Sequence, residues 1–442
     1  MVNVRRKLLA LLSAAALTAC ASSAAFAEGF GVYEWSAAGT AMGENYMFAE
    51  EDPAVLAYNP AQMTKLNGTY FSIGASMVNP DTKVLFRGVN GLMGNDEVWE
   101  NEYDMSVAPY MYYVTKAGKN SWWGIGMFSR FGNQLEYNDL WPGRYDTIFS
   151  GIKGITVQPT YAFKISDKLS AAVGLDINYV KLRMRKNARI AIPGVGHLGD
   201  FGTDLEGDTV NVGWVASLMY DFTPQTSLAV TYRSRIKHTM DDADIGFNGL
   251  LGGMGLFNGM RMSTGAHGTV TLPDSLSIGL GHKFNDRTRV ELNAVWTNWE
   301  TYNALNIYFD PAVSMTIPGS GISASLPGSM NPKNWDASWR YGIGIEHKLS
   351  KQWSILAGYV YDESPVPDWT MDFTIPTGDR HRGSLGFKYR FKENHEVVFA
   401  YTGIWAGSRD VPSKQDGADF QSANIYDGFT QVISLGYTVK LK

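Results

Sequence analysis

The chain has 442 residues, a formal net charge of -5 and one cysteine. Charged residues make up 18% of the sequence, below the roughly 25% of soluble globular proteins, whereas aromatic residues make up 13% and glycine occurs 47 times. This composition is typical of a β-rich protein with an apolar face and many turns, and the lack of a basic tract argues against nucleic acid as a partner.

Residues 1–27 are typical of a secretory signal peptide, with the basic start Arg5-Arg6-Lys7, an apolar run from Leu8 to Ala19 and the small-x-small site Ala25-Phe26-Ala27. The apolar run is shorter than the about 20 residues that a transmembrane helix needs. Leu17-Thr18-Ala19-Cys20 supports a second interpretation, a lipoprotein box with the only cysteine as lipid acceptor. We expect cleavage near Ala27, which leaves a mature chain without cysteine and therefore without a disulfide.

Residues 28–67 show neither strand alternation nor a regular helical period. They contain short apolar pieces, the acidic cluster Glu50-Glu51-Asp52-Pro53 and the tetrapeptide Tyr58-Asn59-Pro60-Ala61. A wide barrel without a plug has an open lumen. We therefore predict that residues 28–67 are an N-terminal hatch, or plug, inside a barrel made by residues 68–442.

The rest of the chain alternates apolar with polar or small residues in segments of the length that membrane β-strands require. In residues 382–391, one face carries Leu385, Phe387, Tyr389 and Phe391 and the other carries Arg382, Ser384, Gly386, Lys388 and Arg390. About fourteen such segments occur, an even number as single-chain barrels require. They lie near 69–78, 104–115, 121–131, 155–165, 168–185, 210–222, 226–237, 268–284, 287–299, 337–348, 352–363, 380–391, 395–406 and 429–441.

A soluble β-sandwich also alternates. The barrel is favoured because the polar faces carry charges and glycines, and because Trp and Tyr lie near strand ends as in an interfacial girdle. Short turns alternate with long loops, predicted at 132–154, 186–209, 238–267, 300–336 and 407–428. Short turns are periplasmic and long loops extracellular in such proteins. We predict an all-β fold, a transmembrane antiparallel barrel of about 14 strands plugged by an N-terminal hatch.

The loop at 238–267 is unusual because its middle is apolar: Ile245, Phe247, Leu250, Leu251, Met254, Leu256, Phe257 and Met260. An exposed apolar surface of this kind needs a partner, which could be another loop, lipid or a hydrophobic ligand. Methionine and glycine make such a surface adaptable. Packing of loop on loop and a ligand-binding groove both remain open.

Basic residues fall into two groups. Lys181, Arg183, Arg185 and Lys186 close the fifth predicted strand at its outer end. The first three alternate with Leu182 and Met184, so this basic set faces outward unless a bulge reverses the sides. The outward set fits lipid headgroup phosphates first and a ligand carboxylate second. A second set, predicted to face the lumen, pairs with carboxylates such as Glu291 and Glu346 or with the plug, and one or two members could hold a ligand carboxylate: Arg233, Arg235, Arg340, Arg382, Lys388 and Arg390.

Signals for catalysis are poor. The sequence has no G-x-S-x-G elbow and no H-E-x-x-H motif, and its seven histidines are scattered. Asp241, Asp242 and Asp244 fit a solvated acidic turn better than a cation site. We therefore predict neither an enzyme nor a bound metal or cofactor.

Taken in order, several short motifs resemble those of the outer-membrane long-chain fatty acid transporters (FadL type), a family that includes a toluene and xylene uptake branch. The similarity extends over the whole mature chain. The motifs are Gly29-Phe30 followed by Glu34; Tyr58-Asn59-Pro60-Ala61; Tyr232-Arg233-Ser234; Leu272-Pro273-Asp274; Trp296-Thr297-Asn298-Trp299; and Asp362-Glu363-Ser364-Pro365-Val366-Pro367 followed by Ile375-Pro376 and Asp379-Arg380.

The resemblance implies a fourteen-strand barrel with a hatch carrying the motif Asn59-Pro60-Ala61. It implies that a hydrophobic ligand lands between the loops 186–209 and 238–267, passes to an internal pocket, and leaves sideways through a kink in the third strand near Gly132-Asn133. Basic residues assist carboxylate binding in the fatty acid members. Candidates for that role here are Lys333, Arg233, Lys181 and Arg183.

The predicted function is an outer-membrane channel for hydrophobic small molecules, most of all long-chain fatty acids. Monoaromatic hydrocarbons are the first alternative, and an outer-membrane hydrolase or a structural barrel the second. The expected partners are the hydrophobic ligand, outer-membrane lipid and lipopolysaccharide, and the barrel-assembly machinery, for a protein acting as a monomer. The chain ends Val439-Lys440-Leu441-Lys442, without the terminal aromatic residue that such machinery commonly recognises.

Overall fold

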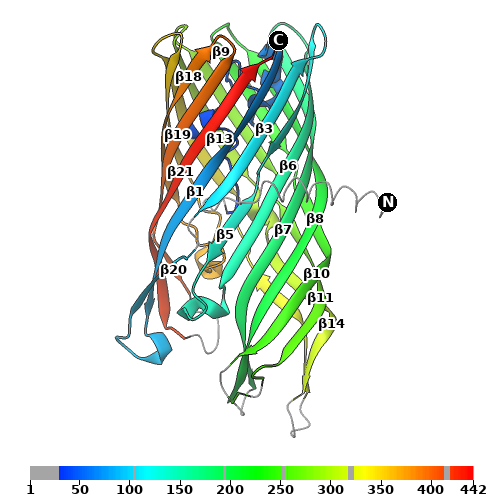
Figure 1. The fold of residues 1–442 in the computed structure, drawn as a ribbon, viewed down its shortest axis with the longest axis vertical. Helices are drawn as coiled ribbons and strands as arrows, with labels where there is room; N and C mark the ends of the chain where they lie inside the picture. The colour runs from blue at the N-terminus through cyan, green and yellow to red at the C-terminus, as the bar shows by residue number, and fades with distance from the viewer. Residues whose placement is uncertain are drawn as a thin grey trace.

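The computed structural model describes residues 29–102, 105–192, 196–250, 254–255, 257–316, 323–412 and 419–441, and the predicted signal peptide lies outside this part of the chain. Twenty-one strand segments form one sheet that closes into a tall barrel (Figure 1). Within the described ranges, no helix combines the length and apolar character needed to cross a bilayer.

The strands are β1 Thr69–Arg87, β2 Glu97–Glu100, β3 Ser106–Lys116, β4 Ser121–Phe128, β5 Gly132–Glu136, β6 Phe149–Lys164, β7 Leu169–Ile192, β8 Gly196–Asp221, β9 Thr226–Arg233, β10 Ile236–Leu250, β11 Arg261–Leu272, β12 Ser275–Lys283, β13 Thr288–Thr297, β14 Ala304–Thr316, β15 Ser323–Pro332, β16 Ser338–Lys348, β17 Trp353–Asp362, β18 Arg380–Lys392, β19 His395–Ala406, β20 Arg409–Val411 and β21 Ser422–Lys440. The helices are α2 Ala37–Ala41, α3 Val55–Tyr58 and the 3₁₀ turns η1 Pro60–Lys65, η2 Val89–Gly91, η3 Pro142–Tyr145, η4 Trp299–Thr301 and η5 Asp368–Thr370.

Antiparallel pairing runs around the barrel in the order β1, β3, β4, β6, β7, β8, β9, β12, β13, β16, β17, β18, β19, β21 and back to β1. This is a closed 14-strand antiparallel barrel, which confirms the predicted fold class. The remaining segments continue seven of these strands beyond an interruption. Short turns and the C-terminal end of β21 lie at one end of the barrel (top of Figure 1), which we call the short-turn end. The other end is the long-hairpin end.

The predicted long loops are largely strand, which corrects the sequence interpretation. β7 and β8 pair through residues expected in the loop 186–209, and β10 and β11 form a hairpin within 238–267. β14 and β15 likewise occupy most of 300–336. The alternation of a lipid-facing strand stops where the barrel leaves the apolar region, but backbone pairing continues because it requires no apolar outer face.

An interruption between β9 and β10 changes which side chains face inward. Arg233 is buried, as predicted, but the side chain of Arg235 is 57% exposed and pairs outside with Asp274 at 3.1 Å. Ser234 is also buried, so two successive residues point inward and Ile236 continues inward after them. The prediction that Arg235 faces the lumen is therefore wrong, because a one-residue shift moves every later side chain to the other face.

Residues 29–67, which we call the N-terminal segment, lie inside the barrel against inward-facing side chains. The Tyr112 hydroxyl donates to the Trp35 carbonyl at 2.8 Å, and the Trp122 indole donates to the Leu66 carbonyl at 2.7 Å. Across the lumen, the Glu291 carboxylate accepts from the Met47 amide at 2.6 Å. Contacts with widely separated strands hold the segment in place.

Inward-facing glycines make room for the N-terminal segment. A Cβ at Gly358 would lie 2.1 Å from the Met42 carbonyl carbon, a distance that no real Cβ contact allows. Gly344 faces the same Met42. The glycines on the polar faces of the predicted strands are thus positions where a second backbone approaches the wall closely.

Candidate functional site

The half of the lumen near the long-hairpin end is filled by one continuous apolar cluster. Side chains of the wall meet side chains from segments that fold inward, including η3 and the chain that follows η5. The Trp141 ring lies 5.4 Å from Phe86 and 5.0 Å from Phe373, all three being buried. This cluster, which we call the apolar chamber, is the largest hydrophobic lining in the described part of the lumen.

The predicted apolar loop is split by the structure. Ile245, Phe247 and Phe257 are buried in the apolar chamber, Leu250 is half-buried, and Met254 and Met260 are exposed. Leu251 and Leu256 lie outside the described residues. Phe201 of β8 packs on Phe257 with ring centroids 4.8 Å apart and on Phe247 at 6.5 Å. The two hairpins expected to form a landing groove therefore contact each other directly.

An aromatic cage surrounds Phe30 at the start of the N-terminal segment. The Phe30 ring lies 4.8 Å from Trp299, 5.3 Å from Tyr302, 5.9 Å from Phe131 and 6.0 Å from Trp335. The preceding Gly29 has a φ of +62°, and a Cβ there would lie 2.2 Å from Trp335. The indole nitrogens of Trp299 and Trp335 are buried with no hydrogen-bond partner among the described residues.

The third barrel strand is interrupted beside this cage. β4 ends at Phe128 and β5 begins at Gly132, so the break occupies residues 129–131, just before the predicted kink at Gly132-Asn133. Within the described residues β5 pairs only with β6. The N-terminal segment covers the break, because Val32 donates to the Arg130 carbonyl at 2.8 Å and Gly132 donates to the Phe30 carbonyl at 2.9 Å. Asn133 is buried and donates to the Thr374 carbonyl at 3.1 Å.

Lys333 is a buried cation at the edge of the apolar chamber. Its ammonium forms an ion pair with Asp372, and both side chains are less than one-tenth exposed. The nearby Asp146 accepts from the Phe373 amide at 2.7 Å. The sequence identified Lys333 but not its counter-ion, which lies 39 residues away along the chain.

Lys186 is a second chamber cation, and the sequence interpretation missed its role. It lies four residues after the buried Leu182, on the same face of β7. It interacts electrostatically with Asp146, Lys333 and Asp372. In the described part of the chain no carboxylate lies within ion-pair distance of its ammonium. Alternation from Leu182 was the available signal, since it already placed the even-numbered residues of this strand inside.

Arg233 is buried between the wall and the N-terminal segment. Its guanidinium lies 3.1 Å from the Asp176 carboxylate, donates to the Gln158 side chain at 2.8 Å and also donates to the Ala57 carbonyl. Arg130 shares Asp176 at 2.7 Å. A ligand carboxylate would have to displace these partners to reach Arg233.

Lys181 and Arg183 lie on the outside of the barrel, side by side along β7. Their side chains are 40% and 45% exposed. Lys181 pairs with Glu206 at 2.5 Å and Arg183 with Asp204 at 2.8 Å, both on the neighbouring β8. The structure therefore does not bring these two candidates together with Lys333, and their charges are balanced by carboxylates.

The motif Asn59, Pro60 and Ala61 connects the N-terminal segment to β8. The Asn59 side chain donates to the Met47 carbonyl at 2.9 Å and accepts from the Ser217 hydroxyl at 2.6 Å. Pro60 begins η1, where the missing amide proton costs no hydrogen bond. All three residues are buried, so the motif is a fixed point of the segment.

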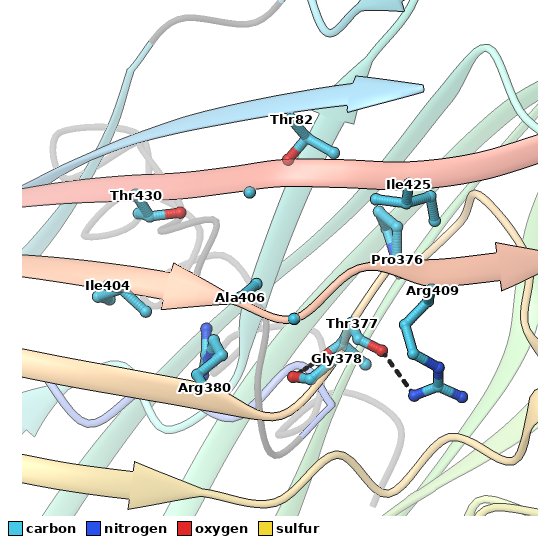
Figure 2. Close-up of a pocket in the computed structure, with 12 residues that line it drawn as sticks. Thr82, Pro376, Thr377, Gly378, Arg380, Ile404, Ala406, Arg409, Ile425 and Thr430 are labelled. Carbon is cyan, nitrogen blue, oxygen red and sulfur yellow. Dashed lines mark hydrogen bonds between the residues drawn. The ribbon is translucent and has the colours of Figure 1, made fainter. Parts of the chain in front are cut away.

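A small pocket lies beside the segment that follows β17, between β18, β19 and β21 (Figure 2). Arg409 donates to the Thr377 carbonyl at 3.2 Å at its edge, and Arg380 lines it from the wall (Figure 2). Its volume of about 20 Å³ suffices for roughly one water molecule. A second pocket of about 20 Å³, lined by Leu182, Leu205 and Val270, borders the apolar chamber. Neither can hold a long aliphatic chain without rearrangement.

Glu44 gives the N-terminal segment a titratable group inside the barrel. Its carboxyl is buried, accepts from the Tyr58 hydroxyl at 2.6 Å, and has one oxygen without a partner in the described residues. Burial, with a smaller contribution from Glu34, raises the pKa of Glu44 to about 8, although Arg382, Tyr58 and Arg340 oppose the shift.

We expect the seating of the segment to weaken as the pH rises from about 4.5, the ordinary pKa, to about 8. In this pH range the Glu44 carboxyl stays protonated while the segment lies inside the barrel but ionises in a released segment, so the bound segment becomes less stable as the pH rises. Above about pH 8 this stabilisation is lost completely. Glu44→Gln should remove the slope, as measured by amide hydrogen exchange of residues 37–48 between pH 4 and 9. The exposed Glu100→Gln is the control, and an unchanged slope in Glu44→Gln contradicts the assignment.

Side chains that bind metals do not gather in this region. The described residues contain no group of three or more His, Cys, Asp or Glu side chains placed to hold a metal ion. The site thus consists of an apolar chamber, two lysines at its edge, and the N-terminal segment, which contacts the break in the third barrel strand.

Comparisons with known proteins agree with this geometry. Residues 18–441 match the family described as outer membrane protein transport protein (OMPP1/FadL/TodX). The chain is 23% identical over 409 residues to a long-chain fatty acid transport protein of Escherichia coli O6:H1, covering 87% of this chain and 88% of that protein. It is 24% identical over 391 residues to outer membrane protein P1 of Haemophilus influenzae, covering 79% and 80%.

Two solved structures share the fold. A Pseudomonas aeruginosa FadL homologue aligns with a TM-score of 0.79 at 19% identity, covering 94% of this chain and all of that one. The toluene transporter TodX of Pseudomonas putida aligns with a TM-score of 0.66 at 17% identity, covering 92% and 99%. The chain therefore belongs to the OMPP1/FadL/TodX family, whose members are transport channels for hydrophobic compounds in the Gram-negative outer membrane and not enzymes.

Proposed function

We propose that this protein takes up long-chain fatty acids or closely similar anionic amphiphiles. The observation that carries the proposal is the combination of a buried apolar chamber with Lys333 and Lys186 at its edge. An aliphatic chain gains about 0.8 kcal/mol for each CH₂ buried in such a lining. The headgroup gains a charge-assisted hydrogen bond, which is stronger than a neutral one.

In this proposal the ligand lands on the hairpins β7–β8 and β10–β11 and separates Phe201 from Phe257. It enters the chamber by displacing side chains that now fill it. Its carboxylate then binds the ammonium group of Lys186, and Lys333 is the second cation. The N-terminal segment acts as the hatch. Release of residues 30–32 from the break at 129–131 opens a lateral path into the membrane.

The test is direct binding of oleate to purified protein. We expect Lys186→Met to weaken oleate about tenfold, as the loss of a hydrogen bond to a charged group does, and to leave binding of a neutral alkane unchanged. Lys333→Met is expected to act in the same direction. Because that change also leaves Asp372 without its partner, it is made together with Asp372→Asn.

Matched controls are Lys181→Met and Arg183→Met, which remove the same charge from the outside of the barrel. Their oleate affinity should equal that of the wild type. Oleate binding that is unaffected by Lys186→Met and by the Lys333→Met, Asp372→Asn pair would exclude the carboxylate assignment.

A monoaromatic hydrocarbon is the second candidate, and the aromatic cage is the observation that favours it. The cage already surrounds a benzene ring, that of Phe30, with edge-on contacts that aromatic pairs prefer. Toluene needs this cage but no cation. Measurable toluene binding without oleate binding would select this alternative.

A further inference from the structure

The short-turn end of the barrel contains a cavity of about 860 Å³. The N-terminal segment supplies one side of it, and the ends of β1, β12, β13, β16, β17, β18, β19 and β21 with their short turns supply the rest. Short turns are periplasmic in barrels of this kind. The cavity, which we call the basin, is therefore the periplasmic mouth of the protein.

The basin is strongly basic. Ten basic and six acidic side chains line it, a formal net charge of +4. The basic ones are Lys65, Lys283, Arg287, Arg289, Lys348, Lys351, Lys388, Arg390, Lys392 and Lys440, and the acidic ones are Glu50, Glu51, Asp286, Glu346, Glu393 and Glu396. The protein as a whole has a net charge of -5, so this excess is a local property.

Internal pairing does not neutralise the basin. Lys388 and Arg289 share Glu346 at 3.1 and 2.6 Å, and Arg390 pairs with Glu51 at 2.9 Å and with Glu396 at 3.1 Å. Five basic side chains have no carboxylate within ion-pair distance in the described part of the chain: Arg287, Lys348, Lys351, Lys392 and Lys440. Only two lining carboxylates, Asp286 and Glu393, are left equally unpaired.

The unpaired cations face the lumen rather than the lipid. Lys348 lies on the same face of β16 as the buried Glu346. The pairing of β18 with β19 shifts register between Arg390 and Lys392, so Lys392 is placed here by its position in the lining of the basin. Arg287 lies in the turn just before β13 and also lines the basin. Because side chains two apart on a strand share a face, Lys348 points into the basin, and Arg287 and Lys392 line the same cavity.

Two adjacent acidic residues of the chain itself already contact the basin. Glu50 and Glu51, adjacent residues of the N-terminal segment, pair with Lys283 of β12 and Arg390 of β18. Both glutamates remain about half exposed, and Glu51 has a φ of +59°. Two consecutive carboxylates thus already pair with two cations of the basin, whereas the five cations named above have no carboxylate partner among the described residues.

We propose that the basin is a docking site for an extended acidic segment of a periplasmic protein. Several cations spread over three successive turns, at Arg287, Lys351 and Lys392, match a row of carboxylates better than one small anion. A cleft of this size is in the usual range for ligand sites, and it admits a strand of peptide but not a folded domain. The proposal is independent of which hydrophobic compound the channel carries.

The test uses the full-length mature protein in neutral-lipid nanodiscs and a fluorescent hexaglutamate peptide. Fluorescence anisotropy should detect binding at low salt that weakens at high salt, as expected for exposed ion pairs. The variant Lys348→Gln, Lys351→Gln, Lys392→Gln should weaken binding about tenfold, the sum of three modest ion pairs. Hexaglutamine should not bind.

The matched control removes three lysines from other turns at the same end of the barrel, in the variant Lys116→Gln, Lys119→Gln, Lys168→Gln. Equal loss in both variants would mean nonspecific attraction and would overturn the proposal. Displacement of the peptide by inorganic phosphate at equal charge would assign the basin to small anions instead. Loss of peptide binding in anionic-lipid nanodiscs would assign it to lipid. Because Lys351 lies in an exposed turn, Lys351→Glu alone should weaken hexaglutamate binding, and this single variant replaces the triple variant if the latter does not fold.

Discussion

Replacing Glu34 by glutamine is expected to destabilise the binding of the N-terminal segment inside the barrel by about 3–5 kcal/mol, the effect of removing one partner of a buried ion pair. The Glu34 carboxylate pairs with Arg382 of β18, and neither side chain is more than 1% exposed. Without Glu34 the buried guanidinium loses its ion-pair partner, and the carboxyls of Glu44 and Asp362 are left to interact with it. The expected results are faster amide exchange in residues 30–48 and a higher conductance in planar bilayers.

Glu51→Gln is the matched control, since it breaks an ion pair between the same segment and the same strand. The Glu51 side chain is 52% exposed and that of its partner Arg390 is 35% exposed. An exposed pair of this kind is worth about 0–1 kcal/mol. If Glu34→Gln and Glu51→Gln have equally small effects, the buried pair does not hold the segment.

Deleting residues 30–57 is expected to leave a folded barrel that leaks small polar solutes. The wall closes on itself through the pairing of β1 with β21, and this pairing does not involve the segment. The deletion removes the backbone that now fills the space beside Gly344 and Gly358 and exposes Arg382 and Arg340 to water in the lumen. Single-channel recordings and solute influx into liposomes would measure the leak.

The control for the deletion is a change that leaves the segment whole, such as Glu100→Gln on the exposed face of β2. Retained strand content and resistance to unfolding in sample buffer show that the barrel is intact. A folded deletion variant with no added conductance would show that residues 30–57 do not close the lumen.

The alternation of residues after position 67 was sufficient to predict the barrel and its strand number. A membrane strand places every second side chain against lipid, so the alternation within each segment indicates which residues face lipid and which face the lumen. Leu385 and Phe387 are exposed on the outside and Arg382 and Lys388 are buried inside, as the pattern of residues 382–391 required. The prediction failed at Ser234, where a local break changes the parity without a clear sequence signal.

The candidate site was only partly predictable. The sequence identified Lys333 because a motif resemblance placed it in a comparable region, and it found the apolar residues Ile245, Phe247 and Phe257. It could not show that Phe201 fills the space between the hairpins. It gave Lys181 and Arg183 more weight than Lys186, because a cluster of charges is visible along the chain while its counter-ions on the next strand are not.

What the sequence by itself determined is everything that depends on the local period of the chain: the strands, their two faces, the short turns and the irregular N-terminal stretch. What only the tertiary structure decided is which charges meet. Arg382 and Glu34 are 348 residues apart, and Arg340 donates to the Gly43 carbonyl across 297 residues. Buried charges persist only when they are paired, and closure of the barrel around the segment is what brings those partners together.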